Sequence, residues 1–293
     1  MRPLNISGSQ AKDYYYAKDP AFSKNGDGLN SCWHGDAART LGLSGKIKKQ
    51  DFLNIISGND LAANNIIKDG VNNEHRAAVD IPFSAPKSVS VIALHVGDDR
   101  LTAAHEKAVA KTLECIESNY VFARKTSNGM TTVERTGNGV FATFTHSTSR
   151  ENDPQLHTHT LIMNMTEAKN GWRATWNDQI FKDQVLLNSV YQSELAKNVK
   201  QLGYQIESGQ NGNWEIAGFK KQWVTNFSKR SAGIDVKEAE LKQKEVFPNA
   251  NESQRRNIAV LESRSDKDPS VLMPELMQRW QQELPRAKIM LPR

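Results

Sequence analysis

The segment F-T-H-S-T-S-R-E-N-D-P-Q-L-H-T-H, from Phe144 to His159, decides the fold that the sequence predicts. It joins the end of one predicted strand, residues 139–146, to the start of another, residues 156–165. Both strands contain the aromatic and β-branched residues that favour sheets, and the polar stretch between them is short. We therefore expect the two strands to pair as an antiparallel hairpin.

Three histidines fall on this hairpin. Side chains alternate between the faces of a strand, so His157 and His159 share a face, and pairing brings His146 beside them at its rim. Three imidazoles with an open fourth position are typical of a catalytic divalent metal site. Imidazole binds Zn, Mn, Ni or Co more tightly than Mg, but the metal, whether Mg, Mn, Zn or Ni, stays open. The alternative is a solvent-exposed polar edge without a metal.

Asp80 is a candidate partner for one of these histidines. It lies between Val79 and Ile81 in another predicted strand, residues 77–84. A carboxylate in mid-strand is costly to bury without a partner, and metal-bound imidazoles commonly donate their second N–H to a carboxylate. The alternative is that this face of the strand is exposed.

The rest of the chain mixes strand pairs with long helices. Long helices are predicted over 100–118 and 183–202, and further strands over 120–124, 130–134, 172–176, 204–207 and 214–216. After Gly218 the pattern is helical, polar and basic. This order favours an α+β fold built on an antiparallel sheet.

Composition excludes several classes of protein. The 293 residues are 38% hydrophobic and 24% charged, which is ordinary for a soluble globular chain. Mean hydropathy is −0.61, and no apolar run approaches the roughly 18 residues that span a bilayer. The polar residues 1–13 contain no signal-peptide core, and two cysteines cannot form a disulfide framework. We therefore expect a cytoplasmic protein that neither crosses nor binds a membrane.

The charge distribution indicates a polyanionic partner. The net charge is +5, and all of it comes from residues 219–293, which hold 15 basic and 10 acidic side chains. A basic end of this kind fits nucleic acid. The alternative is that so small an excess serves only solubility. Neither G-x-x-x-x-G-K-[ST] nor G-x-G-x-x-G occurs, so we expect no nucleotide cofactor.

A run of three tyrosines, Tyr14, Tyr15 and Tyr16, holds half of the six tyrosines of the chain. Such residues can pack in a core or stack on bases. A tyrosyl oxygen can also be a covalent nucleophile once it is activated, and a metal-bound phosphate is a suitable electrophile. Together with the histidines and the basic end, the run is consistent with phosphoryl transfer from DNA onto tyrosine.

At this point the sequence resembles a known family, the relaxase domain of TrwC/TraI-type conjugative relaxases, the MobF class of HUH endonucleases. The matching stretches are the tyrosine run, W-H-G-D-A-A-R-T-L-G-L-S-G (Trp33–Gly45), D-I-P-F-S-A-P-K-S-V-S (Asp80–Ser90), H-S-T-S-R-E-N-D-P-Q-L-H-T-H (His146–His159), N-M-T (Asn164–Thr166) and F-S-K-R (Phe227–Arg230). Together they extend over most of the chain.

The resemblance implies site- and strand-specific nicking and rejoining of plasmid transfer-origin (oriT) DNA. A tyrosine attacks the phosphate and stays bound to it as a 5′-phosphotyrosine, which can later be rejoined. The expected partners are single-stranded DNA with an adjacent hairpin, and the accessory and coupling proteins of a relaxosome in a bacterial cytoplasm. The fold implied is an antiparallel sheet palm flanked by helices, with C-terminal helical fingers.

The resemblance also assigns residues. Residues 1–218 would form the catalytic core, and residues 219–293 would be fingers that close over DNA within the same structural unit. His146, His157 and His159 would hold the metal, and Asp80 would orient a histidine or assist deprotonation of the tyrosine. Four cations in the matching stretches are expected to contact DNA: Lys87, Arg150, Lys229 and Arg230.

One departure concerns the nucleophile. Relatives commonly carry two tyrosine pairs, whereas this chain has one run, and eight residues beyond Tyr14 stands Phe22. A second cleavage would need a neighbour within the run or a second molecule. Tyr14 or Tyr15 is the first candidate, with Tyr16 next. No helicase motif is present in these 293 residues.

Three rival functions remain open. A rolling-circle replication initiator shares the histidine and tyrosine elements. A non-catalytic single-stranded DNA-binding module would bind without forming an adduct. A metallohydrolase of small substrates would not depend on the tyrosines.

Overall fold

A computed structural model describes residues 2–11, 28–67, 76–127, 130–209, 212–244, 250–263, 271–286 and 289. The centre is a five-stranded antiparallel sheet in the order β1-β3-β7-β6-β2. Its strands are β1 (Leu4–Ser7), β2 (Gly28–His34), β3 (Arg76–Ser84), β6 (Phe141–Thr148) and β7 (Pro154–Met163). The predicted β6–β7 hairpin is therefore present, whereas the two edge strands β1 and β2 were not predicted from the sequence.

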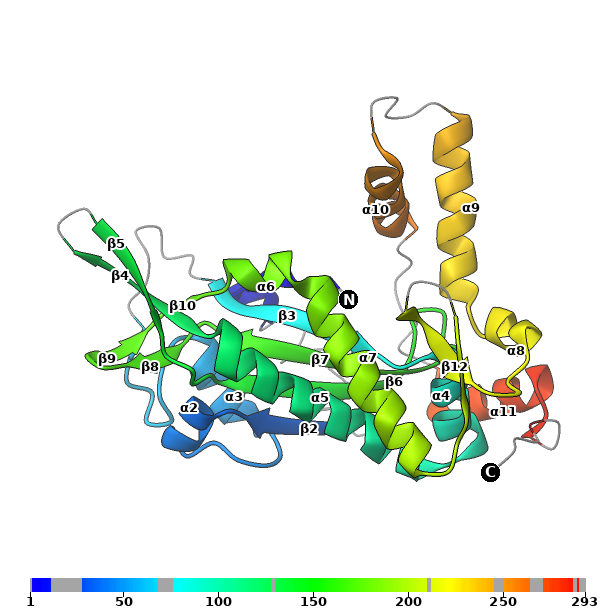
Figure 1. Cartoon of the computed structure of the whole chain (residues 1–293), viewed down its shortest axis with the longest axis horizontal. Coiled ribbons are helices and arrows are strands. Elements are labelled where there is room, and N and C mark those ends of the chain that lie inside the picture. The colour runs from blue at the N-terminus through cyan, green and yellow to red at the C-terminus, as the bar shows by residue number, and fades with distance from the viewer. Residues whose placement is uncertain are drawn as a thin grey trace.

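Two long helices, α5 (Asp99–Tyr120) and α7 (Gln184–Gln201), lie side by side across one face of the sheet (Figure 1). Leu113 on α5 and Leu195 on α7 belong to the same buried cluster as Ile81 and Phe83 of β3. Both helices lie within three residues of the predicted ranges. The Asp98 side chain accepts a hydrogen bond from the Arg100 backbone and caps the start of α5.

The opposite face packs against the N-terminal segments. They include α1 (Gly8–Ala11), α2 (Asp36–Thr40) and α3 (Lys49–Ile56). Phe52 of α3 meets Phe144 of β6 edge-on, with ring centroids 5.5 Å apart, in a second buried cluster. The sheet thus has a core on each face, which makes it the middle of three layers.

The start of α2 requires two glycines that touch. Gly35 has a φ of +103°, and a Cβ added there would lie 2.1 Å from the Gly139 carbonyl oxygen. A Cβ on Gly139 would lie 2.5 Å from the Phe141 ring. The Glu117 carboxylate of α5 accepts hydrogen bonds from the backbone N–H groups of Asp36 and Gly139, at 2.6 and 2.8 Å. The W-H-G-D stretch is therefore fixed against the sheet by its backbone.

Shorter elements surround the sheet. The strands pair as β4 (Phe122–Ser127) with β5 (Met130–Arg135) and β10 (Thr175–Trp176), β8 (Thr166–Ala168) with β9 (Gly171–Arg173), and β11 (Ile206–Ser208) with β12 (Trp214–Ile216). The short helices are α4 (Lys87–Val91), its π-helical continuation η3 (Ile92–Val96), and α6 (Asp178–Lys182). The predicted strand 172–176 is in fact two short strands, which pair with different partners.

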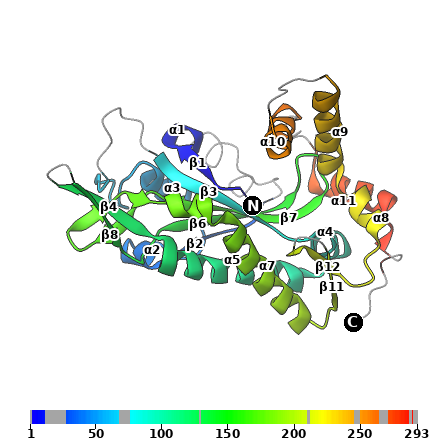
Figure 2. The same cartoon turned by 45° about the horizontal axis from the view of Figure 1, so that its top comes forward.

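The C-terminal region is helical, as predicted. It contains α8 (Lys221–Asn226), α9 (Lys229–Gln243), α10 (Glu252–Glu262) and α11 (Met273–Glu283). Helices α9 and α10 pack on each other and stand away from the sheet, at the end opposite to the β4–β5 ribbon (Figures 1 and 2). We call this pair of helices the arm. The arm is flanked in the chain by α8 and α11. Phe227 at the end of α8 and Trp280 of α11 both belong to the buried cluster that also contains residues of α5 and α7.

The α+β class with an antiparallel sheet is confirmed. Of the helices in the described ranges, none has the length and hydropathy needed to cross a membrane. The division into a catalytic core, residues 1–218, and fingers, residues 219–293, stays a proposal. Described residues from both regions contribute to one buried cluster.

Candidate metal centre

The register of β6 and β7 brings the three histidines together. His146 pairs with His157, and Phe144 pairs with His159, on adjacent antiparallel strands. All three imidazoles extend from the face that packs against α3, because they continue the alternation that buries Phe144 and Leu161 there. The convergence therefore follows from the period of the strands and the position of the turn.

The three rings form a compact triangle. Their centroids are 5.3 Å apart for His146 and His157, 5.6 Å for His146 and His159, and 5.3 Å for His157 and His159. One nitrogen from each ring lies within 4.8 Å of the other two. His146 is buried, and the other two rings are half-buried. This spacing suits three ligands of a single ion, since Zn–N bonds of about 2.1 Å put the ligand nitrogens roughly 3 to 4 Å apart.

Hydrogen bonds orient two of these rings. Nδ1 of His159 lies 2.8 Å from Oδ2 of Asp80, which is 6% exposed, and Nδ1 of His157 lies 3.0 Å from the Gln155 carbonyl. A carboxylate and a carbonyl can only accept, so both Nδ1 atoms donate. The second nitrogen, Nε2, is then the metal-ligating atom of each ring. The donor set and its orientation fit a divalent metal.

The predicted position of Asp80 arises from the third strand of the sheet. β3 pairs with β7 so that Asp80 faces Leu161, two residues beyond His159 and on the same face. A carboxylate at this position reaches diagonally to the imidazole of the neighbouring strand. The sequence prediction of a histidine partner therefore agrees with the observed contact.

Comparisons with known proteins place this geometry in a family. The sequence model described as TrwC relaxase matches residues 6–287. The chain belongs to the TrwC relaxase family. Among curated relatives of this TrwC-family chain, the multifunctional conjugation protein TraI of Escherichia coli is 36% identical over 287 residues, which cover 93% of the chain. The chain spans about 15% of the length of the curated relatives it matches.

Solved TrwC relaxase structures have the same fold. One is TrwC complexed with a 27-mer DNA comprising the recognition hairpin and the cleavage site, with a TM-score of 0.84, 36% identity and 98% of each chain covered. Another is conjugative relaxase TrwC in complex with oriT DNA in a metal-bound form, with a TM-score of 0.85, 35% identity, and 99% of this chain and 98% of that chain covered.

The tyrosines of this TrwC-family chain lie outside the described residues. Tyr14, Tyr15 and Tyr16 fall in the range 12–27. The first described residue after them, Gly28, pairs with His146 at the start of β2. The first residue of β2 therefore lies beside the histidine triangle.

Lys87, one of the predicted DNA contacts, makes its observed contacts within the chain. Lys87 donates from Nζ to the Pro154 carbonyl at 3.0 Å and to Oε1 of Gln155 at 2.7 Å. Burial lowers the pKa of Lys87 to about 8, although nearby carboxylates oppose this shift. Lys87 thus holds the start of β7 in place, and its phosphate contact stays a prediction without support from these contacts.

Lys229 and Arg230 at the start of α9 are also engaged within the chain. Nζ of Lys229 lies 3.3 Å from Asp153 and 2.6 Å from Glu283. The Arg230 guanidinium donates to the Val260 carbonyl at 2.9 Å and also to the Ser263 carbonyl. Arg150 lies half-buried in the turn between β6 and β7. Contact of these three residues with DNA stays a prediction.

The F-S-A-P-K-S-V-S stretch is hydrogen-bonded to the start of the strand that carries His157 and His159. Ser88 accepts a hydrogen bond from the Ile216 backbone at 2.8 Å, and Ser90 accepts one from the Leu156 backbone at 3.1 Å. Both serines are fully buried. The stretch by which the family is recognised therefore ties α4 to β12 and to the start of β7.

One functional candidate was missed. His105 of α5 is fully buried, with Nδ1 2.7 Å from the Tyr191 hydroxyl and Nε2 2.7 Å from the Thr158 hydroxyl. Burial lowers the pKa of His105 to about 3, so it is neutral. A signal was present, since His105 follows Ala104 on the apolar face of a predicted helix, where a polar side chain needs buried partners.

Proposed function

We propose that the chain is the relaxase domain of a conjugation protein, which nicks and rejoins one strand of plasmid transfer-origin DNA. The observation that carries the proposal is the triangle of His146, His157 and His159, oriented through Asp80, in a chain of the TrwC relaxase family. The TrwC structures with oriT DNA and with metal support the same substrate and a divalent metal for this chain.

His146, His157 and His159 would hold a divalent metal, which would polarise the scissile phosphate and stabilise the charge that develops on its oxygens. Asp80 keeps His159 in the tautomer that presents Nε2. The sheet holds the three rings in place before DNA arrives, because each ligand strand is paired on both sides. The site is thus preorganised for charge on a phosphate.

The nucleophile is one of Tyr14, Tyr15 and Tyr16. Its hydroxyl loses a proton, its oxygen attacks phosphorus, and the bond from phosphorus to the 3′ oxygen breaks. The products are a 5′-phosphotyrosine and a 3′ hydroxyl, which takes up the proton. The number of phosphodiester-type bonds is unchanged, so the reverse attack can rejoin the strand. Asp80 is also a candidate for assisting the loss of the tyrosyl proton.

Further parts of the proposal concern partners and place. The DNA includes a hairpin beside the cleavage site, and residues 219–293 act as fingers that close over the single strand. Relaxosome accessory and coupling proteins are expected partners in the bacterial cytoplasm. Arg150 is a candidate for a phosphate contact because its turn adjoins the triangle.

An adduct assay tests the proposal. End-labelled single strands tiled over the transfer origin of the replicon that carries the gene are incubated with Mn²⁺ or with EDTA. We expect a metal-dependent covalent adduct that disappears in one of Tyr14→Phe, Tyr15→Phe or Tyr16→Phe. Tyr204→Phe, whose hydroxyl donates to Asp98 at the start of α5, is the matched control. Binding without an adduct on any strand would favour a non-catalytic DNA-binding module instead.

A further inference from the structure

The turn between β6 and β7 contains a buried carboxylate, that of Asp153. Asp153 is 1% exposed, and its backbone is fixed by hydrogen bonds from the Ser149 N–H to its carbonyl and from its own N–H to the Ser149 hydroxyl, at 2.9 and 3.1 Å. Asn152 adopts a positive φ of 58°. The turn is therefore tightly held and places a buried carboxylate four residues before His157.

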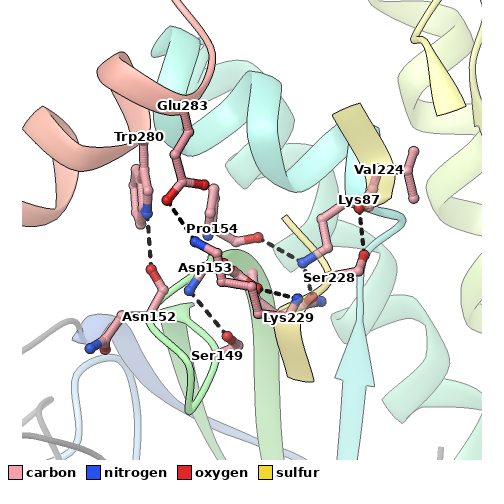
Figure 3. A network of polar contacts seen from close by, with 11 residues as sticks. Lys87, Ser149, Asn152, Asp153, Pro154, Val224, Ser228, Lys229, Trp280 and Glu283 are labelled. Carbon is pink, nitrogen blue, oxygen red and sulfur yellow. Dashed lines mark hydrogen bonds and ion pairs between the residues drawn. The ribbon is translucent and has the colours of Figure 1, made fainter. Parts of the chain in front are cut away.

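This carboxylate caps a helix in another part of the chain (Figure 3). Helix α9 begins after Ser228, whose side chain makes no capping hydrogen bond and instead donates to the Val224 carbonyl at 2.6 Å. Oδ2 of Asp153 accepts the backbone N–H of Lys229, the first residue of α9, at 2.8 Å. A carboxylate at this end of a helix also interacts favourably with the helix dipole.

Further contacts join the same turn to the C-terminal region. The Lys229 ammonium bridges Asp153 on the turn and Glu283 at the end of α11. Trp280 of α11 donates from its indole nitrogen to the Asn152 carbonyl at 2.9 Å. Burial raises the pKa of Asp153, and the backbone N–H and ammonium of Lys229 oppose that shift. The start of α9 and helix α11 are thus both attached to the turn of the histidine hairpin.

We propose that Asp153 is a positioning residue that sets the angle of the arm relative to the histidine triangle, so that a DNA strand held by the arm enters the metal site in register. The proposal rests on the proposed function for its DNA part. Asp153 acts through α9, because both the backbone N–H and the ammonium group of Lys229, the first residue of α9, contact the Asp153 carboxylate. No contact of Asp153 with the reacting atoms is required.

The matched pair of variants is Asp153→Asn and Asp235→Asn. Both remove one carboxylate charge, and both carboxylates pair with a cation of α9 or α10. Asp235 lies on α9 itself with its side chain 58% exposed and pairs with Arg256 within the arm. Effects of net charge on DNA affinity are therefore common to the two variants, and only Asp153→Asn alters the attachment of the arm to the turn.

The first readout is the arm angle without DNA. Nitroxide labels are placed on Lys107→Cys of α5 and Gln243→Cys at the end of α9, both exposed, with Cys32→Ser and Cys115→Ser in the background. Pulsed dipolar distances in the full chain should give one narrow distribution in the parent and in Asp235→Asn. We expect a distribution at least twice as broad in Asp153→Asn. An equally narrow distribution there would overturn the proposal.

The second readout is DNA handling. Asp153→Asn should weaken binding of single-stranded oriT DNA about tenfold relative to Asp235→Asn, while Mn²⁺ affinity without DNA changes less than threefold. An Asp153 that served stability alone would lower the melting temperature and leave the affinity ratio at one, which would contradict the proposal. Glu283→Gln, which removes only the second partner of Lys229, should give a smaller shift in the same direction if Asp153→Asn does not fold.

The two proposals fail separately. If the parent forms no adduct on any oriT strand, the relaxase function is wrong, but the distance measurement still decides whether Asp153 holds the arm. If the adduct forms and the distances do not change, the relaxase function stands and the positioning role of Asp153 is wrong.

Discussion

The Thr158 hydroxyl lies 2.7 Å from Nε2 of His105, on the face of β7 opposite to His157 and His159. Thr158 also hydrogen-bonds Thr145, its partner on β6, at 2.8 Å. Thr145 precedes His146 in the chain, so each ligand strand has a member of this buried network directly behind the histidines. Tyr191 completes the network from α7. The two long helices are thus connected to the back of the metal centre by polar contacts as well as by packing.

We expect Thr158→Val to weaken Mn²⁺ binding about fivefold to tenfold, because the backbone between His157 and His159 loses the contact that fixes it and His105 loses a partner. Isothermal titration of the metal without DNA measures the effect. Thr160→Val is the control, since Thr160 is equally buried on the same face and, within the described residues, its hydroxyl has no hydrogen-bond partner. Equal metal affinities of the two variants would contradict the role of the network.

Acid sensitivity should trace to His105. Its pKa is about 3 in the folded chain and about 6.5 when unfolded, so the unfolded state binds more protons between these values. The contribution of His105 to the free energy of unfolding is therefore fully present above pH 6.5. It decreases as the pH drops toward 3, by about 1.4 kcal/mol per pH unit.

The side chain of His105→Gln cannot take up that proton. Proton uptake on unfolding, which is the slope of the unfolding free energy against pH, should therefore be smaller by about one proton between pH 4 and 6. Denaturant unfolding at several pH values, without metal, measures this slope. The variant is expected to be less stable at pH 7, because a buried network is disrupted. An unchanged slope would show that His105 is not the group that titrates.

Asp80→Asn should lower metal affinity by about tenfold to a hundredfold, because the amide no longer attracts the Nδ1 proton of His159 and can present a donor to it instead. Competition with a chelating dye for Mn²⁺ or Zn²⁺ measures the affinity. Unfolding of the metal-free variant is the control for damage to β3. Unchanged affinity in a folded variant would mean that Asp80 does not orient the ring.

Gly35→Ala should destabilise the chain by more than about 3 kcal/mol, because the added Cβ would meet the Gly139 carbonyl at 2.1 Å and φ is positive. Gly233→Ala is the control on α9, since among the described residues no atom outside the adjoining turns of α9 lies within 4 Å of the Cβ position there. A helix-interior glycine costs about 0.5 to 1 kcal/mol relative to alanine, so this control should gain stability. Thermal unfolding of both variants tests the contrast.

The sequence could predict the histidine triangle because its geometry depends on a local rule. A strand has a period of two, so one turn position fixes which of His146, His157 and His159 share a face. The contact of Asp80 with a histidine could be predicted for a related reason, since a carboxylate between two apolar residues of a strand needs a partner. The ranges of α5 and α7 followed from the helical period of their apolar side chains.

The edge strands could not be predicted in this way. Leu4 in β1 and Leu29 in β2 are 45% and 46% exposed, whereas the core residues Ile6 and Trp33 are the single apolar anchors of their strands. One buried apolar residue in each strand is too short a pattern to predict a strand, and the pairing with β3 and β6 is made by the backbone. The intramolecular partners of Lys87 and Lys229 could not be predicted for a different reason. A lysine in the sequence indicates a surface cation, whereas their partners are brought in by the tertiary fold.

The contact between Gly35 and Gly139 bears on how decayed copies of such genes are to be interpreted. Both positions serve the backbone alone, and neither takes part in chemistry. A gene copy could lose a histidine of the triangle and still keep W-H-G-D and A-P-K-S-V-S, because these stretches hold the fold and do not supply the ligand set. Similarity over those stretches would then report an intact scaffold in a protein that had become inert, and screening genomes for working copies requires the histidines themselves.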